Sequence, residues 1–94
     1  MLPWSSVKIT ELICDERSEA HIARHRVTCE EVEQVVFSSD PLILRTRNGQ
    51  LTILGATEPG RRLFIVPAPL PDGMSYVITA RDMSKGERRR WERR

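Results

Sequence analysis

Aromatic side chains are scarce in this chain, and their scarcity narrows the kinds of protein that it can be. Only 5% of the 94 residues are Phe, Trp or Tyr, and most apolar residues are Val, Ile and Leu. A chain of this length forms one domain with a thin core, because it buries only about two-thirds of the surface that its unfolded form exposes. Such a core suits a small sheet covered by helices better than a deep pocket. We therefore expect a single α+β domain over residues 1–94, without a cofactor.

Cysteine is equally rare, and long apolar runs are missing. Cys14 and Cys29 lack the two-residue spacing of zinc and redox motifs, so we expect two reduced, half-buried thiols. No apolar run approaches the roughly 18 residues that a membrane span needs. No positively charged segment leads into an apolar one in the manner of a secretory signal. We therefore expect a cytoplasmic protein.

Charge is distributed unevenly along the chain, although the net charge is only +2. Residues 1–40 carry four basic and eight acidic side chains, residues 41–80 carry four and two, and residues 81–94 carry seven and three. The positive field therefore grows toward the C-terminus. A field of this sign attracts a polyanion such as RNA, or the acidic face of a partner protein.

Capping signals predict three helices. These are a first helix from Asp15 to His25, a second that opens on the capping box of Thr28 and Glu31 and ends before Pro41, and a last one from Asp82 or Ser84 to Arg94. Alternating apolar and polar residues predict strands at 7–13, 42–47, 51–56, 63–66 and 76–80.

Turn signals define how these strands connect. Asn48-Gly49 predicts a hairpin, and the prolines at 67, 69 and 71, followed by Asp72-Gly73, predict a loop. The resulting order is β-α-α-β-β-β-β-α. Because hairpins join antiparallel strands, we expect a small antiparallel sheet with two N-terminal helices and a C-terminal helix.

Several short phrases occur in a fixed order over nearly the whole chain. They are His21-Ile22-Ala23-Arg24-His25, Val27-Thr28-Cys29-Glu30-Glu31-Val32, Asp40-Pro41, Leu54-Gly55-Ala56-Thr57-Glu58-Pro59-Gly60-Arg61-Arg62-Leu63-Phe64, Ile78-Thr79-Ala80-Arg81-Asp82-Met83 and Glu87-Arg88-Arg89-Arg90. Together they resemble the BrnT family of ribonuclease toxins from bacterial toxin–antitoxin pairs. The resemblance implies a RelE-like fold, RNA cleavage without a metal, and neutralisation by a cognate antitoxin from an adjacent gene. The chain departs from the family pattern at Cys14, Arg26 and Ala56, where Trp, Gly and Arg are frequent.

RNA cleavage without a metal requires a group that activates the 2′-hydroxyl, a cation on the attacked phosphate and a proton for the leaving oxygen. Arginine suits the phosphate because its planar fork matches two oxygens at once. We predict Arg61 and Arg81 for this task, with surface charge as the alternative. Glu58 is a candidate base or orienting group, or an ordinary turn residue. His25 is a candidate for acid–base work; its spacing from His21 also suits a metal pair or a purely structural role.

The basic C-terminal segment is the predicted RNA-binding surface. The candidate residues are Arg62, Lys85, Arg88, Arg89 and Arg90. Trp91 among them can stack on a base or anchor the helix on the sheet. The competing hypotheses are a ribonuclease toxin, a catalytically weak module that binds RNA or an antitoxin, and a purely structural protein. In the first two, an acidic segment of the antitoxin is expected to cover Arg61, Arg81 and the run from Arg88 to Arg90.

Overall fold

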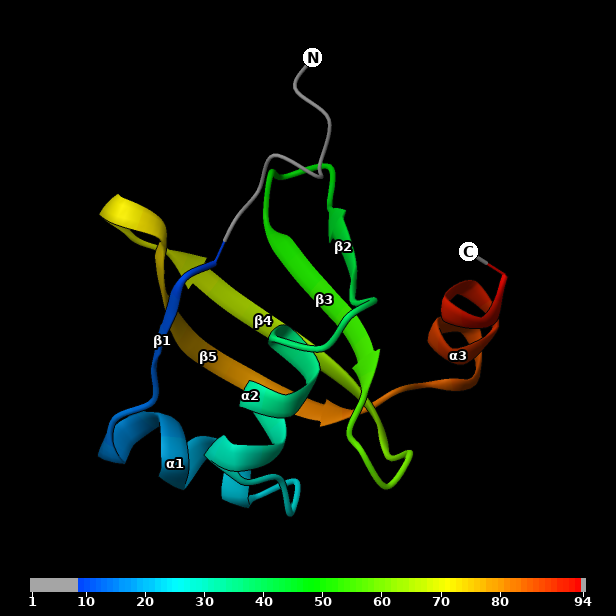
Figure 1. Ribbon diagram of the computed structural model, residues 1–94, viewed down its shortest axis with the longest axis horizontal. Helices are drawn as coiled ribbons and strands as arrows, with labels where there is room; N and C mark the ends of the chain where they lie inside the picture. Colours follow the sequence, from blue (N-terminus) through cyan, green and yellow to red (C-terminus); the bar gives the residue numbers. More distant parts are fainter. Residues whose placement is uncertain (1–8, 94) are drawn as a thin grey trace.

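The computed structural model describes residues 9–93. Its elements are β1 (Glu11–Ile13), α1 (Glu16–Ala23), α2 (Cys29–Val36), β2 (Leu42–Arg45), β3 (Leu51–Ala56), β4 (Arg62–Pro69), the short 3-10 turn η2 (Pro71–Gly73), β5 (Met74–Asp82) and α3 (Lys85–Glu92). The α+β class and the predicted order β-α-α-β-β-β-β-α are confirmed (Figure 1). The predicted first strand and last helix extend to residues 7, 8 and 94, which lie outside the described residues.

The five strands form one sheet in the order β1-β5-β4-β3-β2. Neighbours from β2 to β5 are antiparallel, as the hairpins predicted, but β1 pairs parallel to β5. The sheet is therefore mixed, and the expectation of an entirely antiparallel sheet was wrong. Strand β1 meets the last strand of the chain rather than a hairpin partner, so no local turn signal indicated its direction.

Helices α1 and α2 lie across one face of the sheet, while α3 stands beyond β2 and β3 at its side (Figure 1). The core between the two helices and the sheet consists of aliphatic side chains with almost no exposed surface, among them Ile22, Val35, Ile53 and Val77. Helix α2 approaches β3 so closely that a Cβ at Gly55 would lie 2.7 Å from the Val35 side chain. Glycine is therefore required where this helix crosses the sheet.

The predicted helix caps are confirmed, and they fix where each helix begins. The Asp15 carboxylate accepts from the Ser18 N–H at 2.9 Å, and Thr28 forms a capping box with Glu31. Of the two alternatives for α3, Ser84 is the cap, in a second capping box with Glu87. Helix α1 ends at Ala23 rather than at the predicted residue 25. The residues that follow it are thereby left in a turn on the surface.

Strand β4 is longer than predicted and contains Pro67 and Pro69. Its pairing with β3 ends at Ile65, and the register with β5 shifts between Val66 and Pro67. Beyond Ile65, β4 pairs with only one of the described strands. A proline there lacks a backbone N–H, but no described strand on the other side would accept a hydrogen bond from it. The predicted loop is therefore shorter than expected and is confined to residues 70–73, where η2 lies, and β5 begins at Met74 rather than residue 76.

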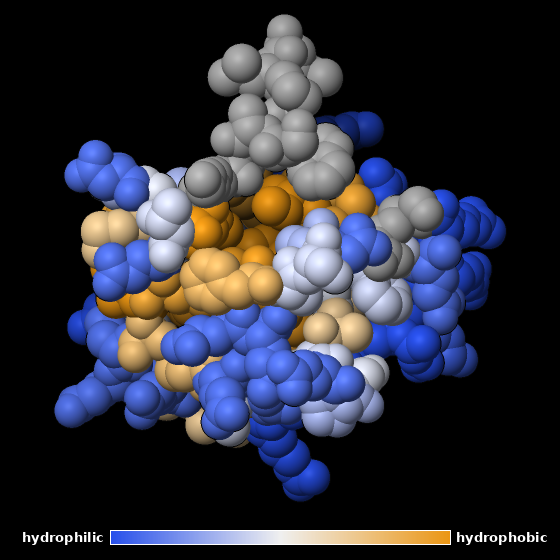
Figure 2. Space-filling model, viewed as in Figure 1, coloured by the Kyte–Doolittle hydropathy of each residue, from blue (hydrophilic) through white to orange (hydrophobic). Residues whose placement is uncertain are grey.

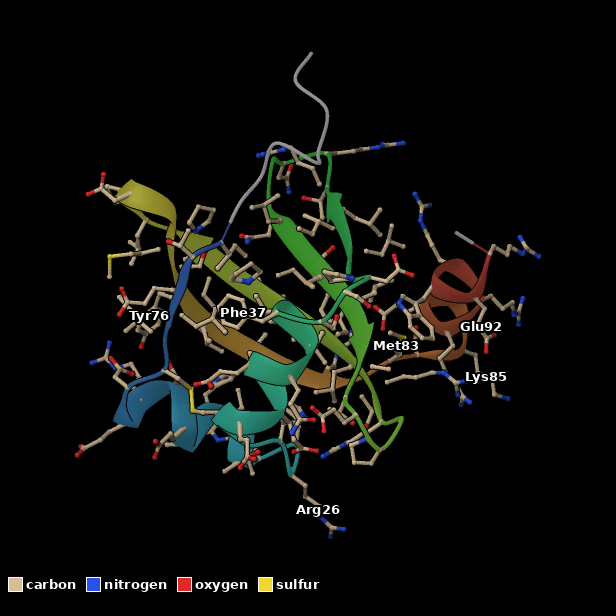
Figure 3. All side chains as sticks on the ribbon, in the orientation of Figure 1. Arg26, Phe37, Tyr76, Met83, Lys85 and Glu92 are labelled. Carbon is tan, nitrogen blue, oxygen red and sulfur yellow. A yellow bond between two sulfur atoms is a disulfide. The ribbon has the colours of Figure 1, made fainter. Side chains whose placement is uncertain are left out.

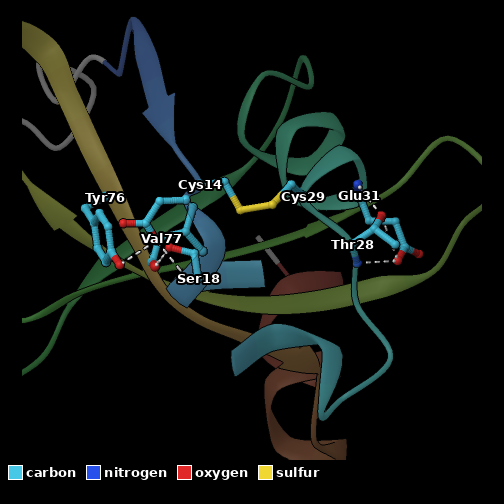
Figure 4. The surroundings of a disulfide bond; sticks show 8 residues. Cys14, Ser18, Thr28, Cys29, Glu31, Tyr76 and Val77 are labelled. Carbon is cyan, nitrogen blue, oxygen red and sulfur yellow. Dashed lines mark hydrogen bonds between the residues drawn. A yellow bond between two sulfur atoms is a disulfide. The ribbon is translucent and has the colours of Figure 1, made fainter. Parts of the chain in front are cut away.

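Cys14 and Cys29 form a disulfide, so the prediction of two reduced thiols was wrong (Figure 4). The bond joins the end of β1 to the first residue of α2, over a sequence separation of 15 and a Cα–Cα distance of 6.2 Å. The fold brings the two residues within the range that disulfides span, which their spacing in sequence did not indicate. Among residues 9–93, no helix is long and apolar enough to cross a membrane.

Candidate functional site

A cleft of about 380 Å³ opens beside the turn that follows α1. Its lining residues come from this turn and from the end of β5: Arg24, His25, Arg26, Arg81 and Asp82. One imidazole and three guanidinium groups thus belong to a single small surface, with one carboxylate beside them. Such a set can hold a phosphate and move a proton next to it.

The turn itself presents the cleft residues to solvent. Backbone N–H groups of His25 and Arg26 donate to the carbonyls of Ile22 and Ala23, which keeps the chain coiled past the helix end. Arg26 then adopts a φ of +59°, the left-handed conformation that favours glycine. Its side chain projects outward from the molecule (Figure 3).

Arg61 lies next to this turn and connects it to other elements of the fold by hydrogen bonds. Its guanidinium donates to Asp82 and to Glu31, at 2.8 Å and 3.1 Å for the shortest contacts. It also donates to the carbonyl of Arg26 at 2.7 Å and to that of His25 at 3.1 Å. Hydrogen bonding to Asp82 is the main cause that raises the pKa of the Arg61 guanidinium, and the same contact lowers the pKa of the Asp82 carboxyl.

Arg81 lines the cleft and is also anchored at the start of α3. Two of its nitrogens donate to the two Glu87 carboxylate oxygens at 2.8 Å and 2.9 Å, and its guanidinium carbon lies 4.0 Å from the centre of the Phe64 ring. The contact raises the pKa of Arg81 and lowers that of Glu87. The Arg81 side chain stays 38% exposed and lines the cleft.

Two of the four predicted catalytic residues, His25 and Arg81, line one cleft. Arg61 contacts the backbone of His25 but is not among the lining residues. Glu58 is exposed in the β3–β4 turn, where its backbone N–H donates to the Gln34 side chain at 3.0 Å; it does not line the cleft.

Sequence reasoning missed three of the lining residues, Arg24, Arg26 and Asp82. The dense basic run around His25 is a signal for the two arginines, but the sequence pattern assigns Arg24 to a helix and Arg26 to the break after it. Asp82 was considered only as a helix cap. Its place in the cleft follows from the length of β5, which could not be fixed from the sequence.

The predicted RNA-binding residues divide into two groups. Arg62 forms an ion pair with Glu92 at 3.4 Å, and its guanidinium lies 5.8 Å from the ring centre of the half-buried Trp91. The basic residues of α3, and Arg93 directly after it, make no ion pair with any of residues 9–93; those of α3 are Lys85, Arg88, Arg89 and Arg90. Figure 2 shows the hydrophilic surface that gathers where α3 lies.

His21 and His25 do not form part of a larger ligand set. Their ring centres are 6.4 Å apart, and residues 9–93 hold no group of three or more His, Cys, Asp or Glu side chains placed to bind a metal ion. Comparisons with models of protein families, with curated proteins and with solved structures found no match for this chain.

Proposed function

We propose that this chain is a ribonuclease toxin that cleaves RNA without a metal in the cleft beside His25. The observation that supports the proposal is the gathering of one histidine and three arginines around one cleft, from two separate parts of the chain. A surface that only attracts RNA would not require a histidine, and a histidine with a purely structural role would not require arginines around it. The combination suits phosphoryl chemistry.

The proposed reaction is an internal attack within RNA. The His25 imidazole takes the proton of the 2′-hydroxyl, and the 2′-oxygen then bonds to the neighbouring phosphorus. The bond from phosphorus to the 5′-oxygen breaks, and this oxygen takes a proton from water. The products are a 2′,3′-cyclic phosphate and a 5′-hydroxyl end. Arg24, Arg26 and the open part of Arg81 stabilise the charge that develops on the phosphate oxygens.

The cations of α3 extend this site. Glu87, at the start of α3, is held by Arg81, so the helix begins directly beside the cleft. Lys85 and Arg88 share one face of the helix with Glu92, and Figure 3 shows Lys85 and Glu92 on the same side. In this proposal the two cations contact the RNA backbone next to the cleaved phosphate.

Cleavage of a fluorescent single-stranded RNA in the presence of EDTA tests the proposal. His25→Ala should lower the rate about 10²- to 10⁴-fold, the usual contribution of an acid–base group. His21→Ala is the matched control, because it removes the neighbouring exposed histidine outside the cleft and should leave the rate unchanged. Equal rates for the wild type and His25→Ala, or products without cyclic phosphate ends, would contradict the proposed chemistry.

Arg81 provides a second measurement. Arg81→Ala should lower the cleavage rate about 10²- to 10³-fold if the guanidinium faces the transition state. Arg81→Lys should recover only part of it, since an ammonium group lacks the planar fork. Melting temperatures must be measured in parallel, because the same side chain holds Glu87.

A catalytically weak module that binds RNA or an antitoxin is the second candidate. It is favoured by the ion pairs of Arg61 and Arg81, since both guanidinium groups already contact carboxylates. Fluorescence anisotropy with the same RNA distinguishes the candidates. Binding without cleavage by freshly purified protein favours the module, whereas binding with cleavage favours the enzyme.

The toxin proposal also includes an antitoxin and a cytoplasmic location. Expression of the chain alone should arrest bacterial growth, and co-expression of an adjacent small gene should restore it. The cytosol keeps most thiols reduced. Rapid alkylation of thiols in intact cells would therefore show Cys14 and Cys29 reduced in the cytosol and oxidised in an extracytoplasmic compartment.

A further inference from the structure

We propose that the outer edge of β2 and the adjoining face of α3 form a docking surface for an acidic, extended segment of a partner protein. This surface shares no lining residue with the His25 cleft. The inference concerns binding alone and stands even if the chain cleaves no RNA.

A groove of about 510 Å³ runs between β2 and α3. Its lining residues are Leu42, Gly86, Arg89, Arg90 and Arg93. Gly86 contributes no side chain, and a Cβ built there would have no neighbour within 4 Å. The first turn of α3 is thus open on the side that faces the groove, with arginines along the turns that follow.

The groove is positively charged because the acidic residues of α3 point elsewhere. Glu87 is bound by Arg81 of β5, and Glu92 by Arg62 of β4. Residues three and four apart share one face of a helix, so Gly86, Arg89, Arg90 and Arg93 form a face without a carboxylate. Three guanidinium groups on one wall of a groove favour a ligand with several negative charges.

On its other side the groove is lined by Leu42, the first residue of β2, which is an edge strand among residues 9–93. β2 is the last strand in the sheet order, and among the described residues it pairs only with β3. Its residues Leu42, Ile43 and Leu44 are apolar and half-buried, and Arg45 is its only charge. Exposed edges usually carry charges, prolines or bulges that prevent another strand from pairing. Here a proline and a charge lie only at the two ends of the strand, at Pro41 and Arg45, and the three residues between them are apolar.

An edge strand beside an arginine face is better matched by a peptide than by RNA. A peptide can continue the backbone hydrogen-bond ladder of β2 and place acidic side chains toward α3, whereas RNA has no amide backbone to pair with the strand. Alternate side chains of an added strand point to opposite faces of the sheet, so acidic residues at every second position can all face α3 while the backbone pairs with β2. We therefore infer a partner segment of about four residues, the length of β2.

A fluorescein-labelled peptide of four Glu-Val repeats, measured by anisotropy against the whole chain, tests the surface. The double variant Arg90→Ala with Arg93→Ala should weaken binding at least about fivefold. The matched control, Lys85→Ala with Arg88→Ala, removes the same charge from another face of the same helix and should change affinity less than twofold. A Lys-Val peptide should not bind. A Glu-Val peptide with alternate backbone nitrogens methylated should lose affinity, because it cannot pair with β2.

Each other outcome overturns the inference. No binding of the Glu-Val peptide rejects the surface, and equal losses in the two double variants reject the groove. Undiminished binding of the methylated peptide rejects strand pairing. If a twelve-nucleotide oligouridylate displaces the peptide, and Arg90→Ala with Arg93→Ala weakens RNA more than the control does, the groove belongs to RNA. His25→Ala separates this inference from the proposed function, since it should lower the cleavage rate and leave peptide affinity unchanged.

Discussion

Arg61 and Asp82 form a two-point ion pair between the β3–β4 turn and the end of β5. The Arg61 Nε donates to Oδ1 of Asp82 at 2.8 Å, and Nη2 donates to Oδ2 at 3.2 Å. The same guanidinium holds the carbonyls of His25 and Arg26. An arginine outside the cleft thus fixes both the turn and the strand end that line it. Arg61 is therefore a positioning residue in the proposed site.

Arg61→Ala should destabilise the fold by about 2–3 kcal/mol, because two carboxylates and two backbone carbonyls lose their donor. Chemical denaturation measures this loss. Arg17→Ala is the matched control, since Arg17 is exposed on α1 and makes no ion pair with any of residues 9–93. It should change the free energy of unfolding by no more than about 0.5 kcal/mol. A fully stable Arg61→Ala that has lost activity would instead support direct catalysis.

Glu87→Gln should change how stability depends on pH. Hydrogen bonds from Arg81 are the main cause that lowers the pKa of Glu87 from 4.5 in the folded protein. A carboxyl with a lowered folded pKa adds stability above its unfolded pKa, and this contribution disappears as pH falls through the folded value. The melting temperature of the wild type should therefore exceed that of Glu87→Gln near neutral pH, and the difference should shrink below about pH 4.5.

Glu33→Gln serves as the charge control for this experiment, because Glu33 is exposed on α2. If both variants show the same pH-dependent difference from the wild type, the effect comes from net charge rather than from the Arg81 contact.

Opening the disulfide should lower stability without changing the fold. A cross-link that closes a loop of this length contributes about 3 kcal/mol, mainly by restricting the unfolded chain. Denaturant unfolding of the oxidised protein, with and without a reducing agent, measures the contribution. The double variant Cys14→Ala with Cys29→Ala should match the reduced wild type and should not respond to the reductant. An unchanged midpoint after reduction would contradict the estimate.

Arg26→Gly should stabilise the turn after α1 by about 0.5–1 kcal/mol. Glycine adopts the left-handed conformation of this position without the steric cost that Arg26 bears at φ +59°, although it adds freedom to the unfolded chain. The same variant should bind RNA more weakly, because it removes a cation from the cleft. Arg24→Ala is the control: it removes a neighbouring cation but should not stabilise the protein. A loss of stability in Arg26→Gly would show that the side chain contributes contacts that outweigh the backbone strain.

The sequence alone determined those features that depend on local chemistry. The capping box at Thr28 and the Asn48-Gly49 turn are set by residues within a few positions of one another, and α2 and the β2–β3 hairpin are accordingly found where they were expected. Strand β3 has the predicted bounds, since turn signals lie directly before and after it in the sequence.

Only the tertiary structure decided the features that depend on residues far apart in the chain. The disulfide, the parallel pairing of β1 with β5, and the prolines within β4 all depend on which segment becomes a neighbour in space. The candidate site follows the same division. His25 and Arg81 were identifiable by type, but the ion pairs of Arg61 and Arg81 join residues from separate elements. Side-chain chemistry is local, whereas the partner of a charge is set by the packing of the whole chain.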